Sequence, residues 1–145
     1  MRLVVQRVTR ASVAIDHKIH AQINKGLLVL VGITHNDTHT TTDYCLQKLL
    51  NLRIFSDENS KMNLSLKQID GELLLISQFT LYGNCQKGCR PSFVQAAPPS
   101  IAKPLYDYMV QQLTGFHTKV KTGVFGADMQ VTIINDGPIT IIIEK

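Results

Sequence analysis

The sequence predicts an α+β fold, in which a mostly antiparallel β-sheet or barrel of about seven short strands is covered by two helices. Two segments have apolar residues at helical spacing, and both are inserted between groups of short, strand-like runs. The regular strand-helix alternation of a doubly wound fold is missing. With 145 residues the chain has the size of one ordinary domain, so we expect residues 1–145 to form a single domain.

The first part of the chain is predicted to be a meander of strands. Short runs rich in β-branched residues occupy residues 2–8, 11–16 and 19–23. His17 and Lys18 are suited to a tight turn between the last two runs. The run GLLVLVGI, residues 26–33, is apolar on both sides, which predicts a central strand covered on both faces.

The first helix is expected from about Thr40 to Phe55, with Asp37 or a nearby threonine as its N-cap. A polar, turn-rich connection follows at residues 56–71, and then a second doubly apolar strand at residues 72–83. Residues 84–100 contain two adjacent prolines and are predicted to be a loop. A second helix carries apolar residues from Ala102 to Leu113, with Gly115 as its stop.

Three strand-like pieces are predicted after the second helix. They are broken at Thr122-Gly123, at Gly126-Ala127 and at NDGP, residues 135–138. Asp-Gly favours a tight reversal, and proline can open a strand where no N–H is required. We therefore expect a hairpin turn at NDGP.

Composition limits the possible functions. No run approaches the ~20 apolar residues that span a bilayer, and three arginines interrupt the N-terminal apolar run, so we expect a cytoplasmic protein without membrane contact. The three cysteines are an odd number and are expected to be reduced thiols. The net charge of +4 permits a polyanionic partner without requiring one.

Motifs for metal or cofactor chemistry are missing. The five histidines and eleven acidic residues are scattered, and Cys85 and Cys89 have no second ligand pair. Neither a dinucleotide nor a P-loop fingerprint occurs. We expect no metal and no cofactor. A Cys-His hydrolase stays open, although no feature directs either cysteine toward a histidine.

Polar residues interrupt the apolar strand at SQFTLYG, residues 77–83. Ser77, Gln78 and Thr80 are either structural hydrogen-bonding groups at a strand end or the lining of a pocket. Strand alternation would direct Gln78 and Thr80 to the same face, where an amide and a hydroxyl can bind a polar ligand.

Three basic residues have two interpretations each. Arg7 shares a strand face with Leu3 and Val5, so it either reaches water or an ion pair, or it anchors a loop through the carbonyl groups of that loop. Lys87 and Arg90, in the loop sequence KGCRPSF, either increase solubility or contact phosphates.

Three separated stretches together resemble the D-aminoacyl-tRNA deacylases, formerly called D-tyrosyl-tRNA deacylases. These stretches are SQFTLYG (77–83), KGCRPSF (87–93) and GVFGADMQVTIINDGPIT (123–140). RLVVQRVTRASV and GLLVLVGI also fit, so the resemblance covers essentially the whole chain. It departs at Ile139, where valine is more common in the family.

The resemblance implies a cytosolic homodimer that hydrolyses the ester linking a D-amino acid to the 3′ end of tRNA. It also implies removal of glycine from mischarged tRNA. The active site would lie at the dimer interface, where a cis Gly137-Pro138 bond of one subunit enters the site of the other as a chiral filter. Further implied roles are a floor of Ser77, Gln78, Phe79 and Thr80, walls of Phe125 and Met129, Arg7 as the anchor of the Gly-Pro loop, and Lys87 and Arg90 as tRNA contacts.

The chemistry needs no metal, because an aminoacyl ester is activated and fixed backbone N–H groups can stabilise the oxyanion. Thr80 could be a nucleophile, but the sequence supplies no adjacent base, so we favour assistance by the 2′-OH of the terminal ribose. The alternatives are another small-ester or amide hydrolase, a purely structural dimer, and a non-catalytic RNA-binding module. An RNA-binding module is disfavoured by the lack of tryptophan and the 6% aromatic content.

Overall fold

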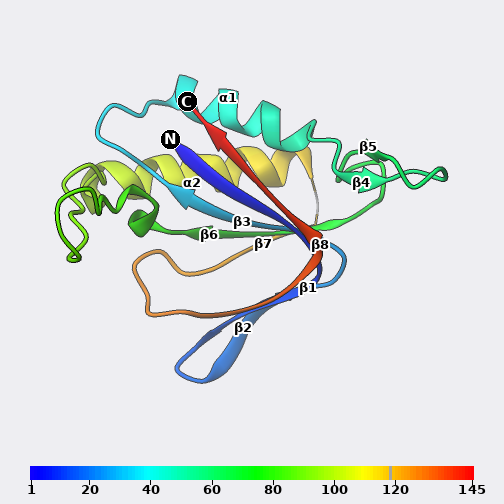
Figure 1. Cartoon of the computed structure of the whole chain (residues 1–145), viewed down its shortest axis with the longest axis horizontal. Coiled ribbons are helices and arrows are strands. Elements are labelled where there is room, and N and C mark those ends of the chain that lie inside the picture. The colour runs from blue at the N-terminus through cyan, green and yellow to red at the C-terminus, as the bar shows by residue number, and fades with distance from the viewer. Residues whose placement is uncertain (118) are drawn as a thin grey trace.

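The computed structural model describes residues 1–117 and 119–145. It contains one main sheet, a small two-stranded sheet, two α-helices and one 3₁₀ helix (Figure 1). In chain order the elements are β1 (Arg2–Ile15), β2 (Lys18–Ile23), β3 (Gly26–Gly32), α1 (His39–Leu50), β4 (Phe55–Ser56), β5 (Met62–Leu64), β6 (Glu72–Ser77), η1 (Phe79–Tyr82), α2 (Pro99–Phe116), β7 (Val120–Thr122) and β8 (Gln130–Glu144).

The long strand β1 organises the main sheet. Residues 2–8 pair with β3 and residues 11–15 pair with β2, both antiparallel, while β8 pairs with β1 from Arg2 to Ala14. The runs 2–8 and 11–16, expected as separate strands, are therefore one strand. Arg10 lies between them and still pairs with Ile134 of β8, so the chain has no reason to turn there. A hairpin joins β1 and β2 as predicted, but its turn is Asp16-His17, both at positive φ, one residue earlier than His17-Lys18, because Lys18 already pairs with Ile15.

The sheet is mixed, and the prediction of a mostly antiparallel sheet is wrong for its second half. β3 pairs in parallel with β6, and β6 pairs in parallel with β7. Each parallel pair is joined by a connection that contains a helix, α1 in the first case and α2 in the second. Such a crossover carries the chain back to the end of the sheet at which the preceding strand began, and parallel pairing requires this.

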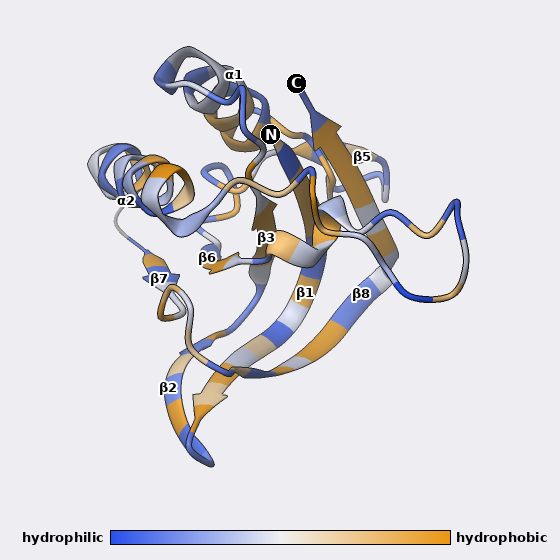
Figure 2. Cartoon of the chain, turned by 90° about the vertical axis from the view of Figure 1, so that its left-hand side faces the viewer, coloured by the Kyte–Doolittle hydropathy of each residue, from blue (hydrophilic) through white to orange (hydrophobic). Residues whose placement is uncertain are grey.

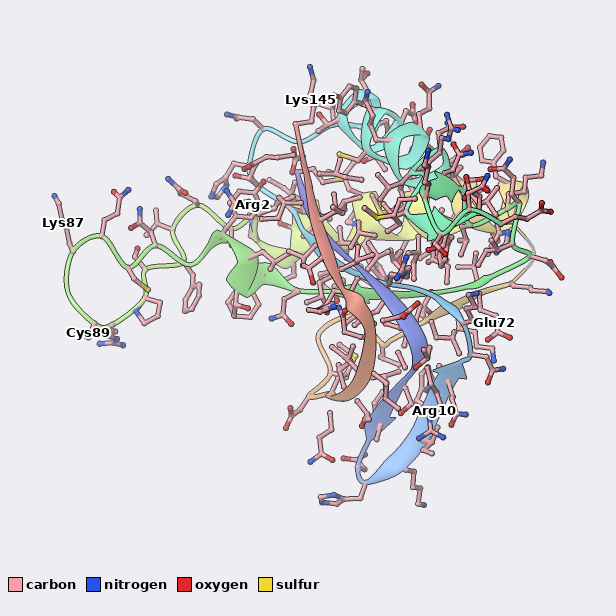
Figure 3. All side chains as sticks on the ribbon, turned by 45° about the vertical axis from the view of Figure 1, so that its right-hand side comes forward. Arg2, Arg10, Glu72, Lys87, Cys89 and Lys145 are labelled. Carbon is pink, nitrogen blue, oxygen red and sulfur yellow. The ribbon has the colours of Figure 1, made fainter. Side chains whose placement is uncertain are left out.

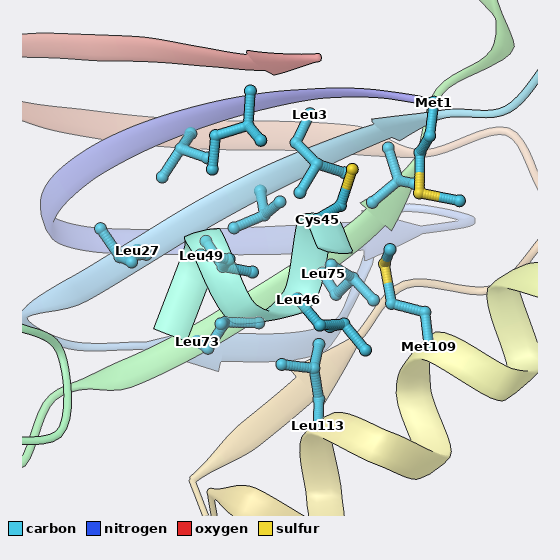
Figure 4. Packing of buried hydrophobic residues seen from close by; sticks show 14 of the residues in the cluster. Met1, Leu3, Leu27, Cys45, Leu46, Leu49, Leu73, Leu75, Met109 and Leu113 are labelled. Atoms are coloured by element: carbon cyan, nitrogen blue, oxygen red, sulfur yellow. The ribbon is translucent and has the colours of Figure 1, made fainter. Parts of the chain in front are cut away.

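Both helices pack on the same face of the sheet (Figures 1 and 4). Their apolar sides meet Leu27, Leu73 and Leu75 of β3 and β6 in the larger core cluster. The opposite faces of these two strands contribute Leu28, Leu74 and Ile76 to a second cluster inside the curve of β1 and β2. The prediction that both strands are covered on both faces is confirmed.

The helix ends follow local capping chemistry. The Thr38 side chain accepts a hydrogen bond from Thr41 N, so a threonine caps α1, one of the two predicted possibilities. Asp37 instead accepts hydrogen bonds from the Met1 ammonium at 2.5 Å and from Thr34 N at 2.7 Å. α1 ends at Leu50, five residues earlier than expected, and α2 continues one residue past Gly115.

Two of the predicted strand regions differ from the elements in the structure. β6 ends at Ser77, and the rest of the expected strand 72–83 is η1, a single 3₁₀ turn. After β7, residues 123–129 form no strand, and the remaining two predicted pieces are one continuous strand, β8. No helix in the described residues is long and apolar enough to cross a bilayer. The three cysteines are unpaired, Cys45 in the core and the other two exposed.

Gly26 permits a close approach between β3 and β6. A Cβ atom at this position would lie 1.8 Å from the carbonyl oxygen of Glu72. We predict that Gly26→Ala lowers the free energy of unfolding by about 3 kcal/mol, because two paired backbones must separate. Urea denaturation measures this change.

Gly115→Ala is the matched control. A Cβ atom there meets nothing within 4 Å and the residue is helical, so this variant should be more stable by about 0.5–1 kcal/mol. Equal stability of the two variants would contradict the close approach.

Candidate active site

A pocket of about 590 Å³ opens where β3 and β6 end. It is bounded by η1, by the segment that leads into α2, and by the connection between β7 and β8. Its lining is largely apolar and consists of Val31, Ile33, Ile76, Ser77, Gln78, Phe79, Phe93, Ala96, Ala97, Pro99, Ala102, Phe125, Gly126, Ala127, Asp128, Met129 and Val131. Five sequence-predicted residues, Ser77, Gln78, Phe79, Phe125 and Met129, are among them.

The 3₁₀ turn η1 supplies the polar edge of this pocket. The backbone N–H of Gln78 donates to Val31 O at 2.7 Å, and its side-chain amide donates to the Thr80 hydroxyl. The two side chains are neighbours, as predicted, but through the 3₁₀ turn and not through strand alternation. In the described chain, the N–H groups of Phe79 and Thr80 donate to no protein acceptor. Two unpaired donors at the start of a helical turn are suited to an oxygen that carries negative charge.

One wall of the pocket, formed by the segment that leads into α2, was not predicted from the sequence. The loop after β3 supports it, since the Thr34 hydroxyl donates to Gln95 O at 2.6 Å and His35 Nε2 lies 2.8 Å from Val94 O. Ala97 N also donates to Ile33 O at 2.9 Å. The only sequence signal was a polar THND directly after a doubly apolar strand, which does not identify its partner.

Aromatic residues form further sides of the pocket. Phe79 and Phe93 form an edge-to-face pair with centroids 5.1 Å apart. The Phe125 ring packs 5.8 Å from the ring of Tyr106, whose hydroxyl donates to Leu75 O at 2.9 Å. Burial raises the pKa of Tyr106, so this hydroxyl keeps its proton and the hydrogen bond at neutral pH.

NDGP does not form the hairpin turn that its residues favour. Asn135 pairs with Val8 and Thr140 pairs with Gln6, so β8 continues along the same neighbour on both sides. Four residues of β8 therefore bulge out opposite the single residue Arg7. The Gly137-Pro138 peptide bond in this bulge is cis, as the resemblance implied, and Gly137 has a φ of 136°.

Arg7 is the anchor of this bulge. Its Nε lies 3.0 Å from the Asp136 carboxylate and donates to Asp136 O at 3.2 Å. Its Nη1 donates to Ile54 O at 2.7 Å, and the residue is buried. The structure thus combines the two interpretations of Arg7, an ion pair and a loop anchor. Asn135 closes the bulge from within, because its amide accepts from Ile139 N at 2.8 Å and donates to Ile139 O at 3.1 Å.

Six sequence-predicted residues do not line the pocket of their own chain, namely Arg7, Thr80, Gly137, Pro138, Lys87 and Arg90. Gly137 and Pro138 are on β8 and do not line it. Lys87 and Arg90 are exposed in the loop 84–92, which projects from the molecule (Figure 3). Asn84 and Ser92 pair at the base of this loop through hydrogen bonds of 2.8 and 2.9 Å.

Metal ligands do not gather in the described part of the chain, where no group of three His, Cys, Asp or Glu side chains lies together. A second hollow of about 570 Å³ lies between α1, α2 and residues 65–67. None of the sequence-predicted site residues lines this second hollow.

The anchoring role of Arg7 can be measured. We predict that Arg7→Met lowers the free energy of unfolding by about 2 kcal/mol, because the Ile54 carbonyl and Asp136 lose a charged partner. Amide hydrogen exchange should accelerate at Asp136, Gly137 and Ile139. Arg10→Met, at an exposed position of the same strand, is the control and should change stability by less than about 0.5 kcal/mol. Similar effects of the two variants would refute the anchor.

Known proteins resemble this chain over its full length. The family model described as D-Tyr-tRNA(Tyr) deacylase matches residues 4–144. A protein of Thermosipho africanus named D-aminoacyl-tRNA deacylase is 52% identical over 145 residues, which are 100% of this chain and 97% of the relative. A protein of the same name from Fusobacterium nucleatum is 55% identical, with 99% and 95% covered.

Two solved structures resemble the fold. One, named c-Myc DNA Unwinding Element Binding Protein, has a TM-score of 0.95 and 42% identity, and 100% of this chain and 99% of that chain are covered. The other, described as a probable eukaryotic D-amino acid tRNA deacylase, has a TM-score of 0.84 with 98% and 97% covered, and at 17% identity it supports the fold alone. The family model and the curated relatives agree over the whole length, and the chain belongs to the D-aminoacyl-tRNA deacylase family.

Proposed function

We propose that the protein hydrolyses the ester bond between a D-amino acid and the terminal adenosine of tRNA, releasing both. Family membership supports the reaction class. The observation that carries the proposal to this chain is a pair of N–H groups that are unpaired among the described residues. One belongs to Phe79, which lines the largely apolar pocket, and the other to Thr80, the next residue of η1. An adenine ring fits apolar walls, and an ester carbonyl needs such donors when it is attacked.

In the proposed reaction, the oxygen of a water molecule attacks the ester carbonyl carbon. The negative charge that develops on the carbonyl oxygen is stabilised by the two N–H groups, and loss of one such donor typically costs about 3 kcal/mol of barrier. The bond to the 3′ oxygen then breaks, and the 3′ oxygen takes up a proton. The products are a free amino acid and tRNA.

The side chains of the site favour assistance by the RNA over covalent catalysis. Among the described residues, Gln78 is the one hydrogen-bonding partner of the Thr80 hydroxyl, and it donates to that hydroxyl. An amide donor cannot remove the proton that a nucleophilic hydroxyl must lose. We therefore assign activation of water to the 2′-OH of the terminal ribose, and placement of the ester to Ser77, Gln78, Phe79 and Thr80.

Chiral selection in this proposal works by exclusion. An enzyme that accepts many D side chains gains little by attracting them, so a rigid wall must occupy the place of an L side chain. Gly137 and Pro138 supply this wall, held in shape by Arg7 and Asn135. Glycine has no side chain to exclude, so glycyl esters on mischarged tRNA are also substrates.

The wall belongs to a second copy of the chain in this proposal. Gly137 and Pro138 lie on the outer strand β8 and are not among the pocket-lining residues of their own chain. This strand carries three large exposed apolar residues, Ile133, Ile134 and Ile142, and its hydrophobic stretches are visible in Figure 2. An exposed apolar outer strand is suited to an interface between subunits.

Binding of nucleic acid without hydrolysis is the rival function, because one similar structure is named for binding a DNA unwinding element. A binding module would retain aminoacyl-tRNA without loss of the ester. The pocket edge formed by η1 would then serve no chemical purpose. Measured loss of the ester separates the two functions.

We predict that the protein releases the amino acid from D-tyrosyl-tRNA and glycyl-tRNA at least about 100-fold faster than from L-tyrosyl-tRNA, a difference of about 3 kcal/mol. Following the acid-precipitable labelled ester measures this release. Thr80→Ala should retain turnover within about tenfold, whereas a 2′-deoxy terminal adenosine should abolish it. Thr80→Ala without activity would restore the covalent route, and normal cleavage of the 2′-deoxy substrate would exclude assistance by the RNA.

We predict that mixed dimers restore activity. Gly137→Val distorts the bulge, because a Cβ atom at position 137 would lie 2.6 Å from Ile139 Cγ1. Phe79→Gly instead removes a side chain that lines the pocket. Each variant alone should be nearly inactive on D-tyrosyl-tRNA. After joint unfolding and refolding, one complete site per mixed dimer should return about a quarter of the normal activity. A site built within one chain would leave the mixture inactive.

A further inference from the structure

The described lining of the pocket contains no basic side chain that could neutralise a phosphate. Its lining includes no lysine, arginine or histidine, and Asp128 is the one ionisable residue among the described lining residues. Affinity for a nucleic acid, however, arises mainly from cations that neutralise backbone phosphates. The body of a tRNA must therefore be bound by basic residues elsewhere on the surface.

Two such cations lie against the ring of Tyr44, and these three residues are called the Tyr44 cluster. The ammonium groups of Lys48 and Lys145 lie 5.6 and 5.0 Å from the centroid of the Tyr44 ring. Both lysines are exposed, and in residues 1–117 and 119–145 neither forms an ion pair with a carboxylate. Lys103 and Lys119, by contrast, each pair with an aspartate.

Contact with one aromatic ring has two consequences for the Tyr44 cluster. The two like charges are held within little more than one Debye length of each other, so an anion placed between them is attracted by both. The cation-π contacts also restrict two long side chains before any ligand binds, which reduces the ordering cost of binding. The backbone of Lys145 is fixed as well, because its N–H donates to Met1 O at 3.1 Å.

The Tyr44 cluster is connected to the pocket through Arg2. Arg2 Nη1 donates to Leu81 O of η1 at 2.7 Å, and its guanidinium group lies 5.0 Å from the Tyr82 ring. Its Nη2 pairs at 2.6 Å with Glu144, the neighbour of Lys145. Figure 3 shows Arg2 between the loop that carries Lys87 and the end of β8 at Lys145. Arg2 and Glu144 thus form a neutral ion pair between η1 and the Tyr44 cluster, and the unpaired cations are those of Lys48 and Lys145.

We propose that Tyr44, Lys48 and Lys145 bind backbone phosphates of the acceptor stem while the 3′ end of the tRNA occupies the pocket. This inference rests on the proposed deacylase function. An A-form RNA helix is recognised through its shape and phosphates, because its deep major groove hides the bases. Two ordered cations without base-reading groups match that requirement, and they bind every tRNA regardless of its sequence.

The experiment compares a complete substrate with a minimal one. D-tyrosyl-tRNA carries the acceptor stem, and a D-tyrosyl ester of the trinucleotide CCA carries only the part that enters the pocket. KM and kcat are measured for both at several salt concentrations. The variants are Lys48→Gln/Lys145→Gln, Tyr44→Leu, and the charge-matched control Lys18→Gln/Lys61→Gln, whose lysines are exposed on the hairpins β1–β2 and β4–β5.

For Lys48→Gln/Lys145→Gln we expect KM for D-tyrosyl-tRNA to rise about tenfold at low salt, with unchanged kcat and a salt slope reduced by about two. Tyr44→Leu keeps both charges, so we expect a rise in KM of about threefold with an unchanged slope. The trinucleotide ester should be cleaved normally by every variant, and the control variant should behave as the unaltered protein.

A double variant that matches the control on D-tyrosyl-tRNA would overturn the proposal, and so would a raised KM on the trinucleotide ester. If the unaltered protein cleaves neither substrate, the deacylase function fails, and filter binding of uncharged tRNA then decides the inference alone. Weaker tRNA binding by the double variant supports the phosphate site. Unchanged tRNA binding, or an effect confined to a DNA duplex with the same number of phosphates, refutes it.

Discussion

The pairing of β1 along both of its edges determines where every part of the candidate site lies. One edge carries β3 and β2, and the other carries β8 over nearly the whole length. β3 in turn positions β6, whose end continues into η1 and the pocket. On the other edge, Arg7 stands where β8 leaves the ladder, and its guanidinium group holds the bulge. The pocket and the Gly-Pro bulge are thus two consequences of one strand.

Apolar patterns predicted much of the fold, and polar interruptions predicted part of the site. β3 and β6 were identified as doubly covered because their adjacent leucines belong to opposite cores, but counting strands cannot show in which direction a crossover returns the chain. Polar residues in an apolar run drew attention to Ser77, Gln78 and Thr80, although none of the three is buried; Ser77 and Gln78 line the pocket and Thr80 is exposed beside it. The shape of η1 was missed, because a 3₁₀ turn of four residues has no periodicity to detect. NDGP was wrongly predicted as a hairpin turn, because its pairing with β1 on both sides overrides the local preference for reversal.

The pocket and the cations that could bind phosphate lie in different parts of the molecule. The pocket walls are aliphatic and aromatic, and the cations stand on the loop 84–92 and around Tyr44. This division suits a substrate whose reacting end is compact while its charge is spread along an extended body. A cation inside the pocket would bring free nucleotides into competition, whereas cations outside act only on a ligand long enough to reach them.

The groups assigned to the proposed chemistry are backbone atoms, namely the N–H groups of Phe79 and Thr80, and the proposed chiral wall is the backbone of the Gly-Pro bulge. Such groups are present at every residue, and a side-chain replacement cannot delete them. Activity of this kind is encoded in the path of the chain more than in the identity of any reactive side chain. Selection would then act most strongly on residues that bend or tether the backbone, such as Arg7, Asn135 and Gly137, even though none of them reacts.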